Sequence, residues 1–85
     1  PWTESVILGG RIDEKWSALH VEAYDPATEI RRRTPVLKTG AYVFLDRFPR
    51  KSTQIFEAVL ADESRIHPRK GKMILASRDD LCIDF

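Results

Sequence analysis

The chain has 85 residues, of which 42% are hydrophobic and 32% charged, and its formal net charge is +1. This length predicts a single β domain over residues 1–85, and the composition excludes intrinsic disorder. A net charge near zero gives no general attraction to nucleic acid or anionic lipid, and one cysteine excludes an internal disulfide framework.

Short apolar runs separated by turn residues recur along the whole chain. In order, they fall at residues 5–8, 18–24, 30–37, 40–49, 53–60, 72–77 and 81–85. The pair Gly9-Gly10 ends the first run, whereas Gly40 opens the fourth and Pro49 ends it. Six to seven short strands at this spacing predict an all-β fold, a small single-domain sandwich or barrel.

The segment from Asp13 to Arg33 has two interpretations. Its apolar residues recur at the helical spacings of three and four. A helix would, however, hold Pro26 in its interior, at a cost of about 3 kcal/mol. The sequence Asp25-Pro26-Ala27-Thr28 fits a type I turn better. We therefore predict two strands joined by this turn.

Alternation and proline position indicate which residues face the core. Leu19, Val21 and Ala23 share one face of the 18–24 strand. Thr34-Pro35 lacks one backbone donor, which predicts an edge position for the 30–37 strand. Cys82 is predicted to be a core residue, as are most of the aromatic residues.

Three basic clusters are candidate binding surfaces. They are Arg31-Arg32-Arg33; Arg47 with Arg50 and Lys51; and Arg65 with His67, Arg69, Lys70 and Lys72. Converging on one face, they would bind phosphates or an acidic partner. The alternative is a solvated face that nearby acids such as Glu57 and Asp62 neutralise. Trp2 and Trp16 flank strands among polar neighbours, so they are the aromatic residues expected outside the core.

No catalytic motif, phosphate loop or metal-ligand spacing is recognisable. His20 and His67 lie far apart with no ligand at a suitable spacing. The sequence therefore predicts no cofactor and no metal site.

Pro1 carries the enzymatic alternative. A prolyl amine at a true N-terminus is a general base, and Arg11 would bind a carboxylate substrate. Pro1, Ile7-Leu8, Gly10-Arg11, Asp13-Glu14 and Leu19 resemble the opening of the 4-oxalocrotonate tautomerase family. That resemblance implies a βαβ fold, with Pro1 as the base and Arg11 at the substrate. Pro26 interrupts the helix that this family requires.

The pattern over residues 5 to 61 resembles a transthyretin-like or carboxypeptidase-regulatory-like β-sandwich. The resemblance is carried by Thr39-Gly40-Ala41-Tyr42-Val43-Phe44 and the closing Pro49. Residues 40 to 80 also suit a small SH3-like barrel of the Tudor type.

We predict a non-catalytic binding or assembly module with a basic and aromatic surface. Its candidate residues are Arg31, Arg32, Arg33, Arg65, Arg69, Lys70, Lys72, Trp2 and Trp16. A protein partner or larger assembly is expected, with nucleic acid as the other partner class and no membrane association. The single cysteine and the lack of a visible signal peptide favour a cytoplasmic location.

Overall fold

The computed structural model describes residues 5–66, 73–74 and 80–85, and short strands make up most of these residues. Within these residues the strands are β1 (Ser5–Arg11), β2 (Ala18–Asp25), β3 (Ile30–Pro35), β4 (Ala41–Val43), β5 (Phe48–Pro49), β6 (Thr53–Leu60), β7 (Arg65–Ile66), β8 (Met73–Ile74) and β9 (Asp80–Cys82). The only helical element described is a 3-10 turn, η2 (Glu14–Trp16). The predicted all-β fold is confirmed, and no described helix is long and apolar enough to cross a bilayer.

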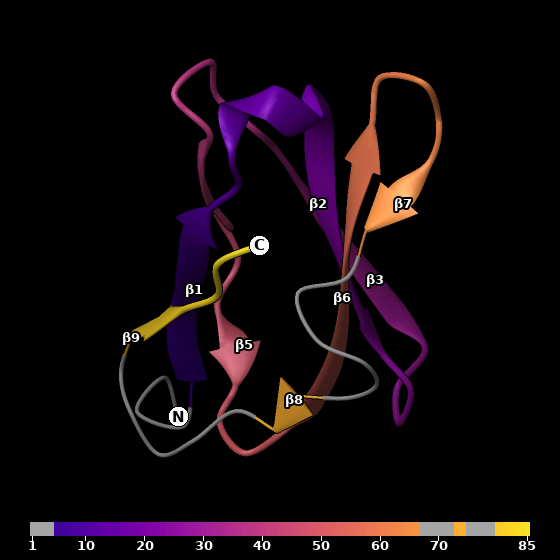
Figure 1. Ribbon diagram of the computed structural model, residues 1–85. Helices are drawn as coiled ribbons and strands as arrows, with labels where there is room; N and C mark the ends of the chain where they lie inside the picture. Colours follow the sequence, from indigo (N-terminus) through magenta and orange to yellow (C-terminus); the bar gives the residue numbers. More distant parts are fainter. Residues whose placement is uncertain (1–4, 67–72, 75–79) are drawn as a thin grey trace.

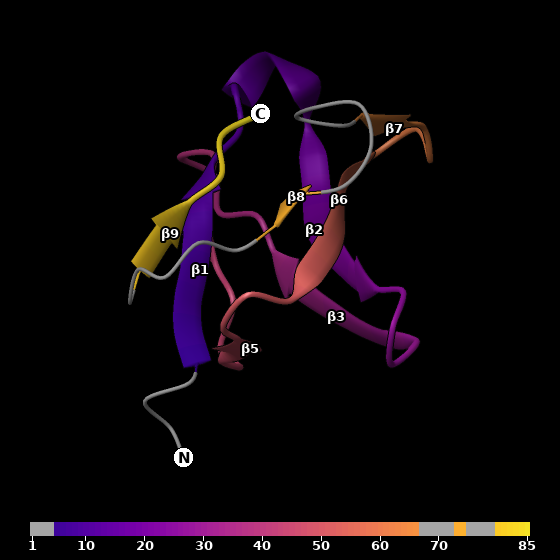
Figure 2. The same ribbon diagram turned by 90° about the horizontal axis from the view of Figure 1, so that it is seen from below.

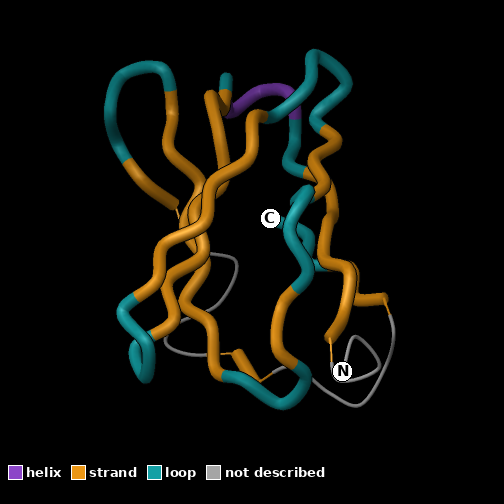
Figure 3. The backbone as a smooth tube through the Cα atoms, turned by 180° about the vertical axis from the view of Figure 1, so that it is seen from behind, coloured by secondary structure: helices purple, strands orange, loops and turns teal. Residues whose placement is uncertain are grey.

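Two sheets face each other across one core, as Figures 1 and 3 show. In the first, called here the β1 sheet, β1 pairs antiparallel with β4 and β5 and parallel with β9. In the second, called here the β2 sheet, the order is β3-β2-β6-β7, and β8 also pairs with β6. Viewed from below, β1 and β9 lie on one side and β2, β3 and β6 on the other (Figure 2). The arrangement is a sandwich.

The core lies between the sheets and draws on both of them. Its buried members are Val6, Leu8, Ile12, Val21, Ala23, Tyr42, Phe44, Phe48, Phe56, Ala58, Leu60 and Ile83. Four aromatic residues are among them, as predicted. The rings of Phe44 and Phe48 meet edge to face with their centroids 5.1 Å apart, a preferred geometry for aromatic pairs.

The first strand does not end at Gly9-Gly10, so that prediction is wrong. β1 continues to Arg11, and Gly9 and Gly10 pair with Val43 and Tyr42 of β4. A Cβ on Gly10 would lie 1.9 Å from the carbonyl oxygen of Ile83. The glycines serve the close approach of neighbouring backbones rather than a turn.

The predicted 40–49 strand is broken into two pieces, β4 and β5. Both pair with β1. Between them, Phe44 keeps a bond from its backbone N–H to the Leu8 carbonyl at 2.9 Å, while Leu45-Asp46-Arg47 leave the ladder and are exposed. The Arg47 Nε donates to Ser5 Oγ at 2.6 Å and ties this excursion to β1.

The turn at Asp25-Pro26 is confirmed, and the helical alternative for this segment is wrong. The Asp25 Oδ1 accepts the backbone N–H groups of Ala27 at 2.9 Å and Thr28 at 3.3 Å. Its Oδ2 accepts Gln54 Nε2 at 3.2 Å. Buried Asp25 therefore closes the β2–β3 connection and joins it to β6.

Side-chain orientations in β2 follow the prediction only in part. Val21 and Ala23 are buried as expected, but Leu19 is 53% exposed, because the β2–β6 register shifts between Ala18 and His20. The edge position predicted for the strand containing Pro35 is confirmed, since β3 ends the sheet order.

The C-terminal predictions also need correction. Cys82 is exposed, and its neighbour Ile83 is the buried residue. The strand predicted over residues 81–85 is shorter than expected, because β9 covers only Asp80–Cys82. Of the predicted 72–77 strand, only Met73–Ile74 is described, as β8. Residues 72 and 75–77 lie outside the described part of the chain.

Candidate functional site

An apolar groove lies where β3 and β4, from two different sheets, come together. It has a volume of about 310 Å³ and is lined by Thr34, Pro35, Leu37, Ala41, Tyr42, Val43 and Leu45. Leu37, Val43 and Leu45 are 62%, 52% and 93% exposed. Aliphatic side chains gathered on one concave surface are typical of a binding site, whereas single exposed ones are ordinary.

Hydrogen bonds to β4 from β3 and from the loop that follows it fix the walls of the groove. The Thr34 hydroxyl donates to the Val43 carbonyl at 2.7 Å, and the Leu37 N–H donates to the Ala41 carbonyl at 2.9 Å. The chain turns from β3 to β4 through Gly40, whose φ of +87° favours glycine. The groove is thus formed by the ordered connection between the sheets.

The three consecutive arginines do not form one patch. Alternation in β3 turns Arg32 toward the core, where its guanidinium lies 4.8 Å from the centre of the Phe48 ring. Arg31 and Arg33 are exposed on the other face. Arg31 lies over the ring of Tyr24 at 4.3 Å. Two arginines of the run, rather than three, face solvent together.

Arg65 belongs to an ion-pair cluster on the outer face of the β2 sheet. Its Nη1 lies 2.9 Å from Glu22 Oε1 and 3.5 Å from Glu57 Oε2. His20 Nε2 lies 3.1 Å from the second oxygen of Glu22. The hydrogen bond from Arg65, aided by His20 and opposed by burial, lowers the pKa of Glu22. Nearby acids therefore neutralise Arg65, and the sheet order separates it from β3.

Four other predicted binding residues, Trp2, Arg69, Lys70 and Lys72, lie outside the described residues. Trp16 lies on η2 and is 40% exposed, as expected for an aromatic residue outside the core. The ammonium of Lys15 stands 5.2 Å from the centre of its ring. Trp16 does not line the groove.

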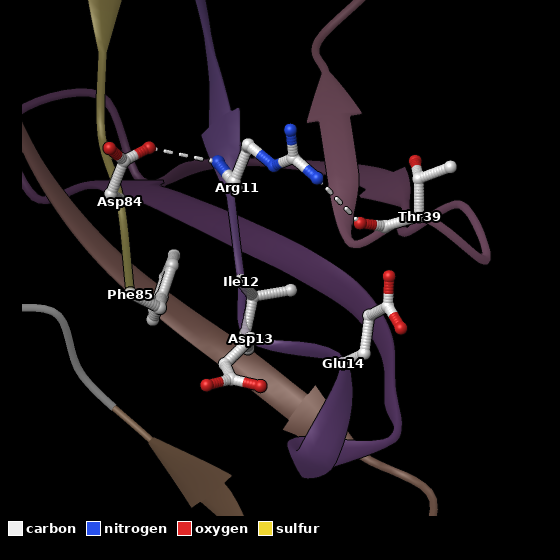
Figure 4. A pocket seen from close by; sticks show the side chains of 7 residues that line it. All are labelled: Arg11, Ile12, Asp13, Glu14, Thr39, Asp84 and Phe85. Atoms are coloured by element: carbon white, nitrogen blue, oxygen red, sulfur yellow. Dashed lines mark hydrogen bonds between the residues drawn. The ribbon is translucent and has the colours of Figure 1, made fainter.

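Arg11 lines a second cavity of about 420 Å³ (Figure 4). Its Nη2 donates to the Thr39 carbonyl at 3.0 Å, and its backbone N–H donates to Asp84 Oδ1 at 3.0 Å. Asp13 and Glu14 line the same cavity. One guanidinium among three carboxylates gives a site that repels anionic substrates.

This cavity does not support the tautomerase alternative. The βαβ fold that the resemblance implies is wrong for the described residues, where 13–33 hold η2, two strands and a turn. Pro1 lies outside those residues.

Metal-binding and thiol chemistry have little basis in the described residues. No group of three His, Cys, Asp or Glu side chains there is placed to hold a metal ion. The Cys82 Sγ lies 3.6 Å from Asp84 Oδ1, and the charge of Asp84 raises the pKa of the thiol. The thiolate is therefore disfavoured.

Comparisons with protein-family models, with curated proteins and with solved structures found no match. The assignment of the groove as the candidate binding site therefore rests on its geometry alone. One signal for it was present in the sequence. With Tyr42 and Phe44 facing the core, alternation puts Val43 and Leu45 together on the opposite face.

Proposed function

We propose that this domain is a non-catalytic protein-binding module that holds a segment of its partner in the groove between β3 and β4. The observation that carries the proposal is the gathering of Leu37, Val43 and Leu45 around one groove of about 310 Å³. Covering these side chains removes apolar surface from water, which favours binding by about 25 cal/mol for each Å² buried. Because hydrogen bonds already hold the walls in place, binding loses less conformational entropy there.

Arg31 and Arg33 extend this site along β3. Both are exposed and lie on the strand that contributes Thr34 and Pro35 to the groove. A partner with acidic groups beside an apolar anchor would match both features. The basic surface expected from the sequence is thereby narrowed to two arginines beside an apolar groove.

We also propose that the domain is related in architecture to transthyretin-like or carboxypeptidase-regulatory-like sandwiches. Two facing sheets support this relation, as does the burial of Tyr42 and Phe44 after Gly40. In such a sandwich the connections at the sheet edges are free to serve binding.

Selection from a random peptide display library tests the binding function directly. Enriched peptides should shift the backbone amide resonances of residues lining the groove. Leu45→Asp should weaken their binding at least about tenfold, because it places a charge beside the anchor. Leu19→Asp is the matched control, since Leu19 is also exposed but lies outside the groove. Both variants should keep the wild-type melting temperature within a few degrees.

Equal binding by wild type and Leu45→Asp would overturn the groove assignment. Tight binding of oligonucleotides with a steep salt dependence, in place of peptides, would assign the arginines to phosphate contacts instead.

A further inference from the structure

We propose that the groove's occupant is an extended acidic segment of another protein, added as an antiparallel strand to the free edge of β3. This inference rests on the proposed function and specifies its partner. An apolar side chain of the segment enters the groove, and acidic side chains lie over Arg33 and Arg31. Such strand addition combines backbone hydrogen bonds with pockets for alternate side chains.

The register of β3 leaves backbone groups available at its outer edge. The Val36 N–H donates to the Leu19 carbonyl at 3.0 Å, so the facing pair His20 and Pro35 is a non-hydrogen-bonded pair. Because such pairs alternate, Arg33 and Arg31 are also in non-hydrogen-bonded pairs with β2. Their N–H and C=O groups point away from β2. Among the described strands, β3 pairs with β2 alone.

The charges along this edge favour an acidic strand. Arg31 and Arg33 have no ion-pair partner among the described carboxylates. Glu22 faces Arg33 across the strands, but its carboxylate is bound by Arg65 at 2.9 Å and by His20 at 3.1 Å. Arginine at an edge also discourages pairing between two copies of β3, since that would bring like charges together. The same residues attract an acidic strand.

Alternation along β3 predicts the sequence that fits. The Thr34 side chain points toward β4, since its hydroxyl donates to the Val43 carbonyl at 2.7 Å, so a residue added opposite Thr34 projects its side chain toward Val43 and Leu45. The residues opposite Arg33 and Arg31 project to the outer face. In an antiparallel strand the recognised order is therefore an apolar residue, an acid, any residue and a second acid.

The peptide Ser-Ser-Leu-Glu-Ser-Glu-Ser, capped at both ends, has this order. Its reversed sequence is a control of identical composition. N-methylation of the glutamate that follows leucine removes the donor to the Arg33 carbonyl, and should weaken binding at least about tenfold. N-methylation of the leucine alters an amide that points away from β3, and should change binding less than about threefold. The reversed peptide should bind at least about fivefold more weakly.

Swapping charges tests the arginines. The double variant Arg31→Glu, Arg33→Glu should lose about tenfold in affinity for the peptide, and a peptide with lysines in place of its glutamates should recover it. Hydrogen exchange at the Arg33 amide should slow on binding.

The outcomes separate this inference from the proposed function. Equal effects of the two N-methyl groups, or no rescue by the lysine peptide, would overturn the strand-addition mode. If Leu45→Asp still weakened binding at least about tenfold in that case, the groove would remain the binding site. If neither the selected peptides nor the designed peptide bound in the groove, both proposals would be overturned.

Discussion

Gly10 shows how the absence of a side chain lets neighbouring backbone segments approach closely. It lies on β1, which runs between β4 and β9. A Cβ at this position would meet the Ile83 carbonyl oxygen at 1.9 Å and the Tyr42 hydroxyl at 3.0 Å. That hydroxyl donates to the same Ile83 carbonyl, and burial raises the pKa of Tyr42 above its ordinary value. The absence of a side chain allows this buried contact to form.

Gly10→Ala should therefore destabilise the domain by about 3 kcal/mol, because backbone atoms rather than a flexible side chain would have to move. Urea denaturation followed by circular dichroism measures the change. Ile7→Val, a conservative change at a partly exposed position of β1, should change stability by less than about 0.5 kcal/mol. A Gly10→Ala variant as stable as Ile7→Val would show that the backbone at Ile83 does not approach β1 this closely.

Among the elements, β2 carries the charge network of the outer face. Glu22 on β2 accepts from Arg65 on β7, and Glu57 on β6 lies between them in the sheet order. Isolated exposed pairs contribute little, but the Glu22 side chain is only 19% exposed. This network ties the short strand β7 to the centre of the β2 sheet.

The lowered pKa of Glu22 predicts a pH dependence of stability. The unfolded chain binds a proton at Glu22 more readily than the folded one, so the stabilisation is present above the ordinary pKa of 4.5. This stabilisation is lost as the pH falls through the lower pKa that Glu22 has in the folded state. Glu22→Gln should therefore be less stable than wild type at pH near 7, and the difference should shrink below pH 4.5.

Urea midpoints of both proteins across this pH range measure the effect. The difference at neutral pH should also decrease in about 1 M salt, which screens partly exposed pairs. A difference that stays constant as the pH falls would mean that the Glu22 charge contributes nothing, and that the glutamine acts by shape alone.

Local signals in the sequence predicted elements well where contacts are local. The 53–60 strand is found with the same bounds as β6, and Asp25-Pro26 is the turn. Long-range contacts decided the rest. Gly9 and Gly10 resemble a strand end until their neighbours in space are known. Alternation brings Val43 and Leu45 together, but the complete groove could not be predicted. Leu37 joins them only through the path of the loop between β3 and β4, which the Leu37 N–H bond to the Ala41 carbonyl fixes.

At the scale of the whole molecule, one buried cluster among the described residues joins both sheets and residues 83–85. Ile83 follows β9 and is buried in a cluster that includes Val6 of β1, Val21 of β2 and Phe56 of β6. Its N–H donates to the Gly9 carbonyl at 2.7 Å. Because the cluster spans both layers, neither sheet buries its inner face without the other, and the domain should unfold as one cooperative unit.

Ile83→Ala tests that cooperativity. Removing a buried isoleucine side chain should cost about 2 to 4 kcal/mol, and the loss should appear as one shifted transition. Far-UV circular dichroism and tryptophan fluorescence should give coincident urea curves, because both report the same unit. Cys82→Ala, an exposed position one residue away, is the matched control and should change stability by less than about 0.5 kcal/mol. Two separate transitions, or a loss no larger than that of Cys82→Ala, would mean that the C-terminal segment lies outside the cooperative core and that the β1 sheet is held without it.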